Sequence, residues 1–214
     1  MCLLSSVPYS YASSSDICYT STIMSERKHV KIVAFVGLAG SGKSSAVEYV
    51  TQKGVPKVYG GGIIVEGVRA LGLEVTPENE KHYREEMREK HGKDYFIKKC
   101  IEQMKHLIDA GQHRIVFDGL YTWTEYKTLK HEFPGELYVV SIVTPKKLRY
   151  ERMAKRSFRP LASHEVDQRD WAEIENLEKG GPIAIADHFI VNDGNLEKLH
   201  AQVDAELRSI NFYD

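Results

Sequence analysis

The first residues that could perform chemistry lie in a glycine-rich run. Residues 37–44 read Gly-Leu-Ala-Gly-Ser-Gly-Lys-Ser, which fits the phosphate-loop spacing G-x-x-x-x-G-K-[ST]. Glycines there allow a positive φ and let backbone N–H groups approach an anion closely. In such a loop Lys43 contacts the β- and γ-phosphates of a nucleotide, and the hydroxyl of Ser44 binds magnesium. The residues expected to contact the nucleotide are Gly37, Leu38, Ala39, Gly40, Ser41, Gly42, Lys43, Ser44 and Ser45.

Asp118 is a second candidate, because it ends the apolar run 114–118. An aspartate that ends a parallel strand lies at the carboxyl edge of the sheet, where open α/β folds bind ligands. Beside the loop, its carboxylate would either hold a magnesium-bound water or accept the proton of an attacking hydroxyl, and the sequence leaves both roles open. A simple turn formed by Asp118 and Gly119 is the structural alternative.

An arginine-rich segment follows at residues 145–170. Arg149, Arg152 and Arg156 are spaced i, i+3 and i+7, which predicts that they share one face of a helix. Mobile guanidinium groups can neutralise the equatorial oxygens of a phosphoryl group during its transfer. We therefore expect a lid on which Arg152 and Arg156 are catalytic. A solvated basic face paired with nearby carboxylates is the alternative.

Composition excludes several classes of protein. The chain has 214 residues, of which 42% are hydrophobic and 28% charged, and its net charge is -1. A chain of this length suits one sizeable α/β domain, and its charge balance argues against nucleic acid as the main partner. No apolar run approaches the roughly 20 residues that cross a bilayer, so we expect no membrane partner. The three cysteines neither pair evenly nor show metal-ligand spacing, which favours a reducing, cytoplasmic location. The sequence leaves the oligomeric state open.

The first 24 residues differ from the rest of the chain. They are rich in Ser, Tyr and Thr, and Asp16 is their only charged residue. They lack the features of a secretory signal or a transit peptide. We expect residues 1–27 to be a disordered or loosely held tail and residues 28–214 to form one domain. Met24 is an alternative start of the protein.

The remaining chain alternates strand-like and helix-like segments, which predicts a parallel sheet with helices on both faces. A helix is expected to begin at Thr76, with Pro77 at its first position, and to end at Gly92. Another such helix is expected to begin at Thr144-Pro145. The strands are expected at residues 30–36, 55–59, 114–118, 136–143 and 187–191.

The order of these segments resembles that of the P-loop kinases. The specific pieces are the Thr-Pro-Glu-Asn helix that continues into Met-Arg-Glu-Lys-His-Gly-Lys-Asp-Tyr-Phe, the Asp-Gly after a strand, and Ile-Ala-Asp-His-Phe-Ile-Val-Asn-Asp-Gly-Asn-Leu-Glu-Lys-Leu. The resemblance covers residues 28–207 and is closest to an archaeal-type nucleotide-kinase-like family related to dephospho-coenzyme A kinase. It implies a three-layer fold with a five-stranded parallel sheet in the order 2-3-1-4-5, ATP with magnesium, and transfer of the γ-phosphoryl group. It also implies that Asn192, Asp193 and Gly194 lie near adenine, whereas without it they read as a turn before the last helix.

One segment departs from the pattern of that family. After the second strand the family has Gly-Asp-x-x-Arg, whose arginine serves the acceptor. Here the residues from Gly62 read Gly-Ile-Ile-Val-Glu, so Ile63 replaces the aspartate and Glu66 the arginine. A carboxylate there would repel an acceptor phosphate. We therefore expect either that Arg84 and Arg88, which share a helix face, hold the acceptor, or that the acceptor is not a simple monophosphate.

The sequence thus predicts a magnesium- and ATP-dependent kinase with a small nucleotide-like acceptor. A nucleoside monophosphate is preferred, and the ribose hydroxyl of dephospho-coenzyme A is the alternative. The rival from another class is a switch that hydrolyses a nucleoside triphosphate, which the absence of a guanine-reading Asn-Lys-x-Asp motif disfavours. A degenerate kinase kept as a nucleotide-binding module is a third possibility, which the Glu66 departure keeps open.

Overall fold

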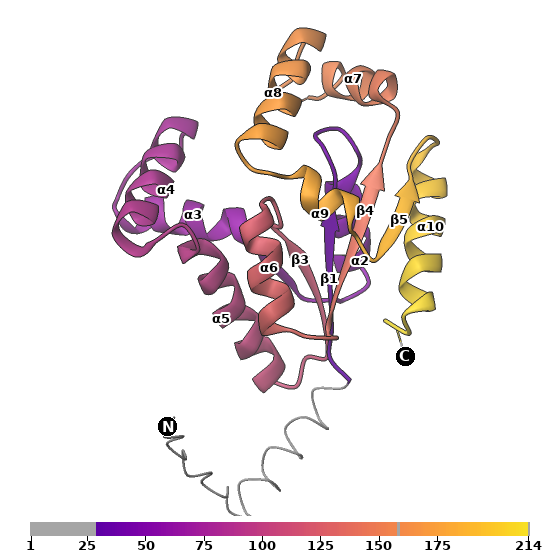
Figure 1. Ribbon diagram of the computed structural model, residues 1–214, viewed down its shortest axis with the longest axis horizontal. Coiled ribbons are helices and arrows are strands. Elements are labelled where there is room, and N and C mark those ends of the chain that lie inside the picture. The colour runs from indigo at the N-terminus through magenta and orange to yellow at the C-terminus, as the bar shows by residue number, and fades with distance from the viewer. Residues whose placement is uncertain (1–28, 158, 214) are drawn as a thin grey trace, which may run out of the picture.

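Five parallel strands form one central sheet in the order β2-β3-β1-β4-β5 (Figure 1). The computed structural model describes residues 29–157 and 159–213, so the tail expected at residues 1–27 lies outside the described residues. The sheet order that the resemblance implies is confirmed. The predicted strands end at the observed last residues and begin at most two residues early. The strands are β1 (Lys31–Val36), β2 (Lys57–Tyr59), β3 (Arg114–Asp118), β4 (Leu137–Val143) and β5 (His188–Val191).

Helices cover both faces of the sheet. On β1, Ile32 and Val36 contribute to the core beneath α5 and α6, whereas Val33 and Phe35 pack with α2 and α10. Burial on both faces explains why the strands are nearly continuous apolar runs. The helices are α2 (Lys43–Thr51), α3 (Gly60–Ala70), α4 (Pro77–His91), α5 (Tyr95–Asp109), α6 (Trp123–Glu132), α7 (Lys146–Ala154), α8 (Ser163–Glu175), α9 (Gly180–Ala184) and α10 (Leu196–Ser209).

The termini of α4 and α7 test two predictions of helix boundaries. The hydroxyl of Thr76 accepts a hydrogen bond from the N–H of Asn79, and Gly92 follows the last residue of α4, as predicted. The prediction for α7 is partly wrong, because that helix starts after Pro145 and Thr144 does not cap it. The hydroxyl of Thr144 instead donates to the carbonyl oxygen of Ser41 at 3.0 Å.

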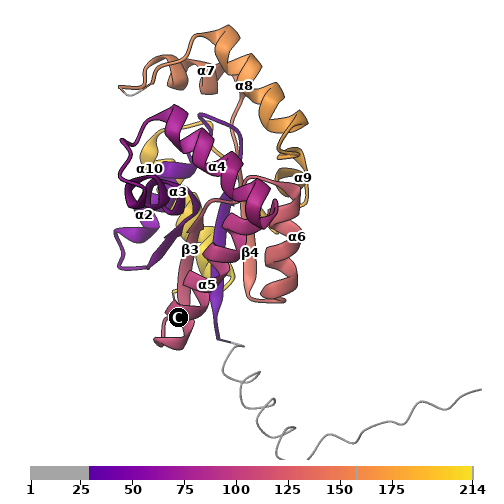
Figure 2. The same ribbon diagram turned by 90° about the vertical axis from the view of Figure 1, so that its left-hand side faces the viewer.

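Two pairs of helices lie around the edge of the sheet where the strands end. α7 and α8 lie above the carboxyl ends of the strands, and α3 and α4 lie beside the sheet on the side of β2 and β3 (Figures 1 and 2). None of the helices in the described part of the chain is long and apolar enough to cross a membrane.

Candidate active site

The glycine-rich loop joins β1 to α2 and has the geometry of a phosphate cradle. Gly37, Gly40 and Gly42 have φ values of 145°, 78° and 104°. A Cβ atom at Gly37 would collide with the carbonyl oxygen of Ile142, and one at Gly42 with the side-chain amide of Asn192. No side chain caps the first turn of α2, so its N–H groups remain available to an anion.

Residues from two other strand ends hold this loop. The carbonyl oxygen of Ser41, a residue only 1% exposed, accepts hydrogen bonds from the hydroxyl of Thr144 at 3.0 Å and the amide of Asn192 at 2.8 Å. Thr144 follows β4 and Asn192 follows β5. The loop is therefore fixed by the sheet before any ligand binds, which lowers the entropy cost of binding.

Lys43 folds back over the loop. Its ammonium group donates to the carbonyl oxygens of Gly37 at 2.6 Å and Leu38 at 3.1 Å. Burial and, as a smaller effect, the charge of Lys179 lower the pKa of Lys43 to about 7, while Glu173 acts in the opposite direction. A polyphosphate in the loop would supply the negative charge that favours the ammonium form.

A cavity of about 310 Å³, here called the phosphate cavity, opens over the loop. Ser44 and Asp118 both line it, so a hydroxyl and a carboxylate face the same space. The described residues contain no group of three or more His, Cys, Asp or Glu that could hold a metal. Magnesium commonly binds one or two protein oxygens together with phosphates and water, so this donor set fits magnesium. The cavity is lined by Ala39, Gly40, Gly42, Lys43, Ser44, Ser45, Tyr59, Asp118, Tyr121, Arg152, Met153, Arg156, Arg169, Glu173 and Lys179.

Asp118 ends β3 beside this cavity, as the sequence predicted. Burial raises the pKa of its carboxyl group, and the charges of Lys57 and Lys43 partly offset that effect. A raised pKa makes the carboxylate a better proton acceptor, while its place in the cavity that Ser44 also lines suits a metal shell. Both roles predicted for Asp118 therefore remain compatible with its surroundings.

A smaller cavity of about 270 Å³, here called the base cavity, adjoins the loop on the side of β5. Asn192 and Gly194 line it, and their contact with adenine stays a prediction. Asp193 does not line it, because its carboxylate is exposed and pairs with Lys198 at 2.6 Å. Arg152 donates to the carbonyl oxygen of Gly194 at 2.9 Å and so closes one wall.

The largest of these cavities, about 670 Å³ and here called the acceptor cavity, lies between α3, α4, α5 and α8. Arg84 and Arg88 both line it, and the buried Nε atom of Arg88 has no hydrogen-bond partner among the described residues. Gly62 and Glu66 do not line it. Glu66 is exposed on α3, so the repulsion expected from its carboxylate does not act inside the cavity. The lining is Tyr59, Gly60, Gly61, Ile64, Val65, Val75, Glu80, Arg84, Arg88, Phe96, Ile97, Cys100, Gly119, Tyr121, Thr122, Glu125, Arg159, Arg169, Glu173 and Leu177.

The arginine-rich segment divides into two groups. Arg152 and Arg156 line the phosphate cavity, although α7 ends before Arg156 and the predicted single helix face is therefore incomplete. Arg149 does not line the phosphate cavity. It is only 5% exposed and forms a buried ion pair with Asp170. The expectation of three guanidinium groups over one site is wrong for Arg149, because a buried charge needs a fixed partner.

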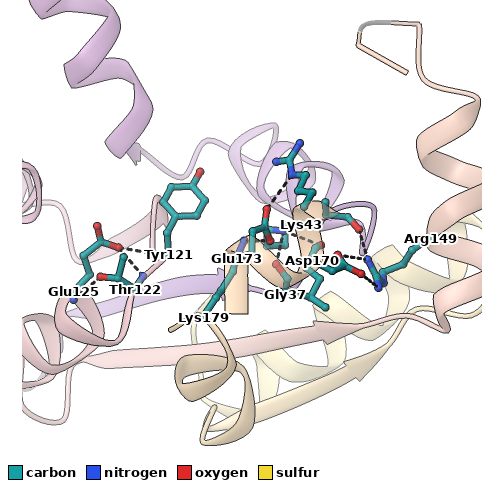
Figure 3. A network of polar contacts seen from close by, with 12 residues as sticks. Gly37, Lys43, Tyr121, Thr122, Glu125, Arg149, Asp170, Glu173 and Lys179 are labelled. Carbon is teal, nitrogen blue, oxygen red and sulfur yellow. Dashed lines mark hydrogen bonds and ion pairs between the residues drawn. The ribbon is translucent and has the colours of Figure 1, made fainter. Parts of the chain in front are cut away.

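Sequence reasoning missed several charged residues at this site. Glu173 of α8 accepts hydrogen bonds from Arg169 at 3.0 Å and from the ammonium of Lys179 at 2.7 Å (Figure 3). No local motif marks Glu173 or Lys179, since only the fold brings α8 and α9 to the loop, whereas Arg169 lies within the arginine-rich segment 145–170. Glu125 is different, because the Thr-x-x-Glu spacing from Thr122 is a capping-box signature that sequence analysis can find.

Glu125 lines the acceptor cavity near Arg88. Its Oε2 atom accepts hydrogen bonds from the N–H groups of Tyr121 at 2.8 Å and Thr122 at 2.9 Å (Figure 3). Burial raises the pKa of this carboxyl group, whereas those hydrogen bonds and the charge of Arg88 lower it. The capping box therefore fixes a carboxylate at the wall of the cavity.

Comparison with known proteins identifies relatives and a fold. A family described as an AAA domain matches residues 33–160. A UPF0200 protein of Thermococcus gammatolerans is 33% identical over 182 residues, covering 84% of this chain and 95% of the relative. A UPF0200 protein of Thermococcus kodakarensis is 34% identical over 175 residues, covering 80% of this chain and 94% of the relative.

Two solved structures show the same fold. The shikimate kinase of Bacteroides thetaiotaomicron has a TM-score of 0.54 at 9% identity and covers 84% of this chain and 98% of its own. The shikimate kinase of Acinetobacter baumannii, in complex with shikimate, has a TM-score of 0.51 at 17% identity and covers 85% of this chain and 95% of its own. At these identities the likeness shows the fold alone.

Proposed function

The chain belongs to the UPF0200 family and has the P-loop kinase fold, and from these premises we propose that it is a magnesium- and ATP-dependent phosphotransferase. It moves the γ-phosphoryl group to a small nucleotide-like acceptor. The observation that carries this proposal is the continuity of three cavities across one edge of the sheet.

Shared residues join these cavities into one path. Gly42, Ser45 and Arg152 line both the base cavity and the phosphate cavity. The phosphate and acceptor cavities share Tyr59, Tyr121, Arg169 and Glu173. A nucleotide with its phosphates in the loop therefore presents its last phosphate toward the acceptor cavity, which is the arrangement that in-line transfer requires.

The residues of the chain divide the work of transfer between them. The loop N–H groups and Lys43 bind the phosphates, and Arg152 and Arg156 neutralise charge on their oxygens. Ser44 and Asp118 are placed to hold magnesium, which supplies charge neutralisation between the β- and γ-phosphates. Catalysis by these groups is mainly a matter of position and electrostatics.

The lining of the acceptor cavity favours a nucleoside monophosphate. Arg84 and Arg88 supply cations for a phosphate, and Tyr59, Phe96 and Tyr121 supply aromatic surface for a planar base. A ribose hydroxyl, as in dephospho-coenzyme A, is the second candidate, because the raised pKa of Asp118 suits the removal of a hydroxyl proton.

Transfer from labelled ATP tests the proposal. The protein is incubated with magnesium, γ-labelled ATP and a panel of nucleoside monophosphates and dephospho-coenzyme A, and the products are separated. Label on one acceptor supports the kinase, whereas label only in inorganic phosphate favours a nucleotide-hydrolysing switch. Lys43→Ala serves as the control, and it should lower transfer roughly 100- to 1,000-fold, because it removes a cation from the reacting phosphates.

A further inference from the structure

A buried lysine lies at the boundary between the phosphate and acceptor cavities. Lys179 is only 2% exposed and precedes α9, yet it lines the phosphate cavity together with Lys43. Its ammonium group lies 5.2 Å from the ring centroid of Tyr121, and Tyr121 and Glu173 line both cavities. Lys179 is therefore near the point where a phosphoryl group would pass between two ligands.

The ammonium group of Lys179 has unused hydrogen-bonding capacity. An ammonium has three N–H donors, and one of them binds Glu173 at 2.7 Å. Among the described residues, no other hydrogen-bond acceptor contacts this ammonium group. Two donors thus remain for a ligand, in a place where unsatisfied charged groups are costly.

The positive charges around the phosphate cavity favour the binding of an anion. Lys43, Lys179 and Arg169 all line this cavity, and the carboxylate of Glu173 accepts hydrogen bonds from both Lys179 and Arg169. Holding two lysines at one cavity is unfavourable without a ligand, and a phosphate would relieve the repulsion between them.

The two partners of this ion pair belong to different elements. Lys179 is anchored to the body of the protein, because Ile183 of α9 packs against the core and an added Cβ on Gly181 would lie 2.8 Å from the ring of Trp123. Glu173 belongs to α8, which reaches over the site (Figure 2). The backbone at Lys179 is therefore already fixed, and Glu173 orients the ammonium group of its side chain.

We propose that Lys179 is a second catalytic lysine, whose ammonium group contacts the non-bridging oxygens of the phosphoryl group during transfer, and that Glu173 is its positioning residue. This inference rests on the proposed function. The acceptor oxygen forms a bond to the γ-phosphorus as the bond from that phosphorus to the bridging oxygen breaks. The electron pair of the broken bond stays on ADP. A monophosphate acceptor attacks as an anion and releases no proton, whereas a hydroxyl acceptor passes its proton to Asp118.

The competing explanation is that Lys179 only neutralises Glu173 inside the protein. Binding measurements separate the two roles. The probes are ADP with magnesium, and ADP with magnesium and aluminium fluoride, which mimics a phosphoryl group in transfer. Lys179→Met should weaken binding of the aluminium fluoride complex by about tenfold to a hundredfold, as expected for lost hydrogen bonds from a charged group, and leave ADP affinity within about twofold.

Neutral variants keep the test independent of folding. Glu173→Gln with Lys179→Met removes both charges of the pair, so a purely structural lysine predicts that this double variant binds the aluminium fluoride complex as tightly as Glu173→Gln alone. A catalytic lysine predicts that it binds more weakly, with ADP affinity retained as the measure of an intact fold. Lys147→Met, which changes an exposed lysine of α7 away from the cavities, should leave both affinities unchanged.

Two results would overturn the inference about Lys179, and a third would overturn the proposed function as well. Lys179 has only a structural role if Lys179→Met binds the aluminium fluoride complex as tightly as the wild-type protein, or if the double variant binds it as tightly as Glu173→Gln alone. A wild-type protein that binds neither ADP nor the complex refutes the proposed function itself, and the inference falls with it. These outcomes are distinguishable because nucleotide binding by the wild-type protein is measured first.

Discussion

The guanidinium group of Arg149 binds both carboxylate oxygens of Asp170, at 3.0 and 2.6 Å, and both side chains are buried. The same guanidinium donates to the carbonyl oxygen of Ala39 at 2.9 Å. One ion pair therefore joins α7, α8 and the phosphate loop. Arg169 and Glu173, which line the active-site cavities, lie on the same α8, so their positions depend on this pair.

Breaking this pair should destabilise the protein. Asp170→Asn leaves a buried guanidinium without its charged partner, and we expect the free energy of unfolding to fall by about 3–5 kcal/mol. Chemical denaturation monitored by circular dichroism measures the change. Asp167→Asn is the matched control, because Asp167 lies three residues before Asp170 on α8 and pairs with the exposed Lys146 of α7, a pair whose loss should cost far less. Equal losses in the two variants would contradict the role assigned to the buried pair.

Nucleotide binding should depend on pH through Lys43. Its pKa is lowered to about 7 in the free protein, so the side chain loses its charge as the pH rises through that value. Bound phosphates favour the ammonium form, and binding above this pKa therefore takes up a proton. Affinity should be highest below the pKa and fall by up to about tenfold per pH unit above it.

Calorimetry in buffers of different ionisation enthalpy measures this proton uptake directly. At about pH 8.5 the apparent binding enthalpy should vary with the buffer as one proton uptake requires, and at about pH 6 the variation should be much smaller. Lys43→Met should bind weakly and lose most of the difference between the two pH values. A proton uptake that persists in Lys43→Met would assign the titration to another group.

The parts of the structure that short sequence patterns determine can be predicted from the sequence. The phosphate loop, the five strands and α4 follow from glycine spacing, apolar runs and caps, all of which act within a few residues. Arg149 shows the limit of that reasoning, because its spacing from Arg152 fits one helix face but only the fold brings Asp170 to bind it. Lys179 and Glu173 pair within six residues of each other, but only the fold places that pair at the phosphate cavity. Contacts between elements distant in sequence determined the parts of the site that local patterns could not.

Asp118 has two candidate roles that magnesium titration can separate. Asp118→Asn keeps the shape of the side chain but removes its charge, and we expect turnover to fall roughly 100- to 10,000-fold if the carboxylate accepts a proton. If it serves the metal shell, the magnesium concentration for half-maximal activity should rise as well. Turnover is measured across a magnesium series with ATP saturating. A variant with unchanged turnover and an unchanged magnesium midpoint would make Asp118 a turn residue.

Arg88 should hold the acceptor. It lines the acceptor cavity four residues after Arg84 on α4, and its buried Nε atom has no partner among the described residues. Neither Glu85 nor Glu89 pairs with it in the described structure, so no ion pair within α4 accounts for its guanidinium group. A buried donor without a partner is costly, and the phosphate of an acceptor would satisfy it.

Arg88→Ala should therefore weaken acceptor binding and slow transfer while ATP affinity stays within about twofold, because a misplaced acceptor loses the in-line geometry. We expect kcat/KM for the acceptor to fall by about tenfold to a hundredfold, as for a lost hydrogen bond to a charged group. Steady-state kinetics with the acceptor varied at saturating ATP, together with a direct ATP-binding titration, measure both effects. Arg69→Ala is the control, since Arg69 is exposed on α3 and lines none of the three cavities. Unchanged acceptor kinetics in Arg88→Ala would exclude the clamp, and an equal loss of ATP affinity would mean that α4 contacts the nucleotide rather than the acceptor.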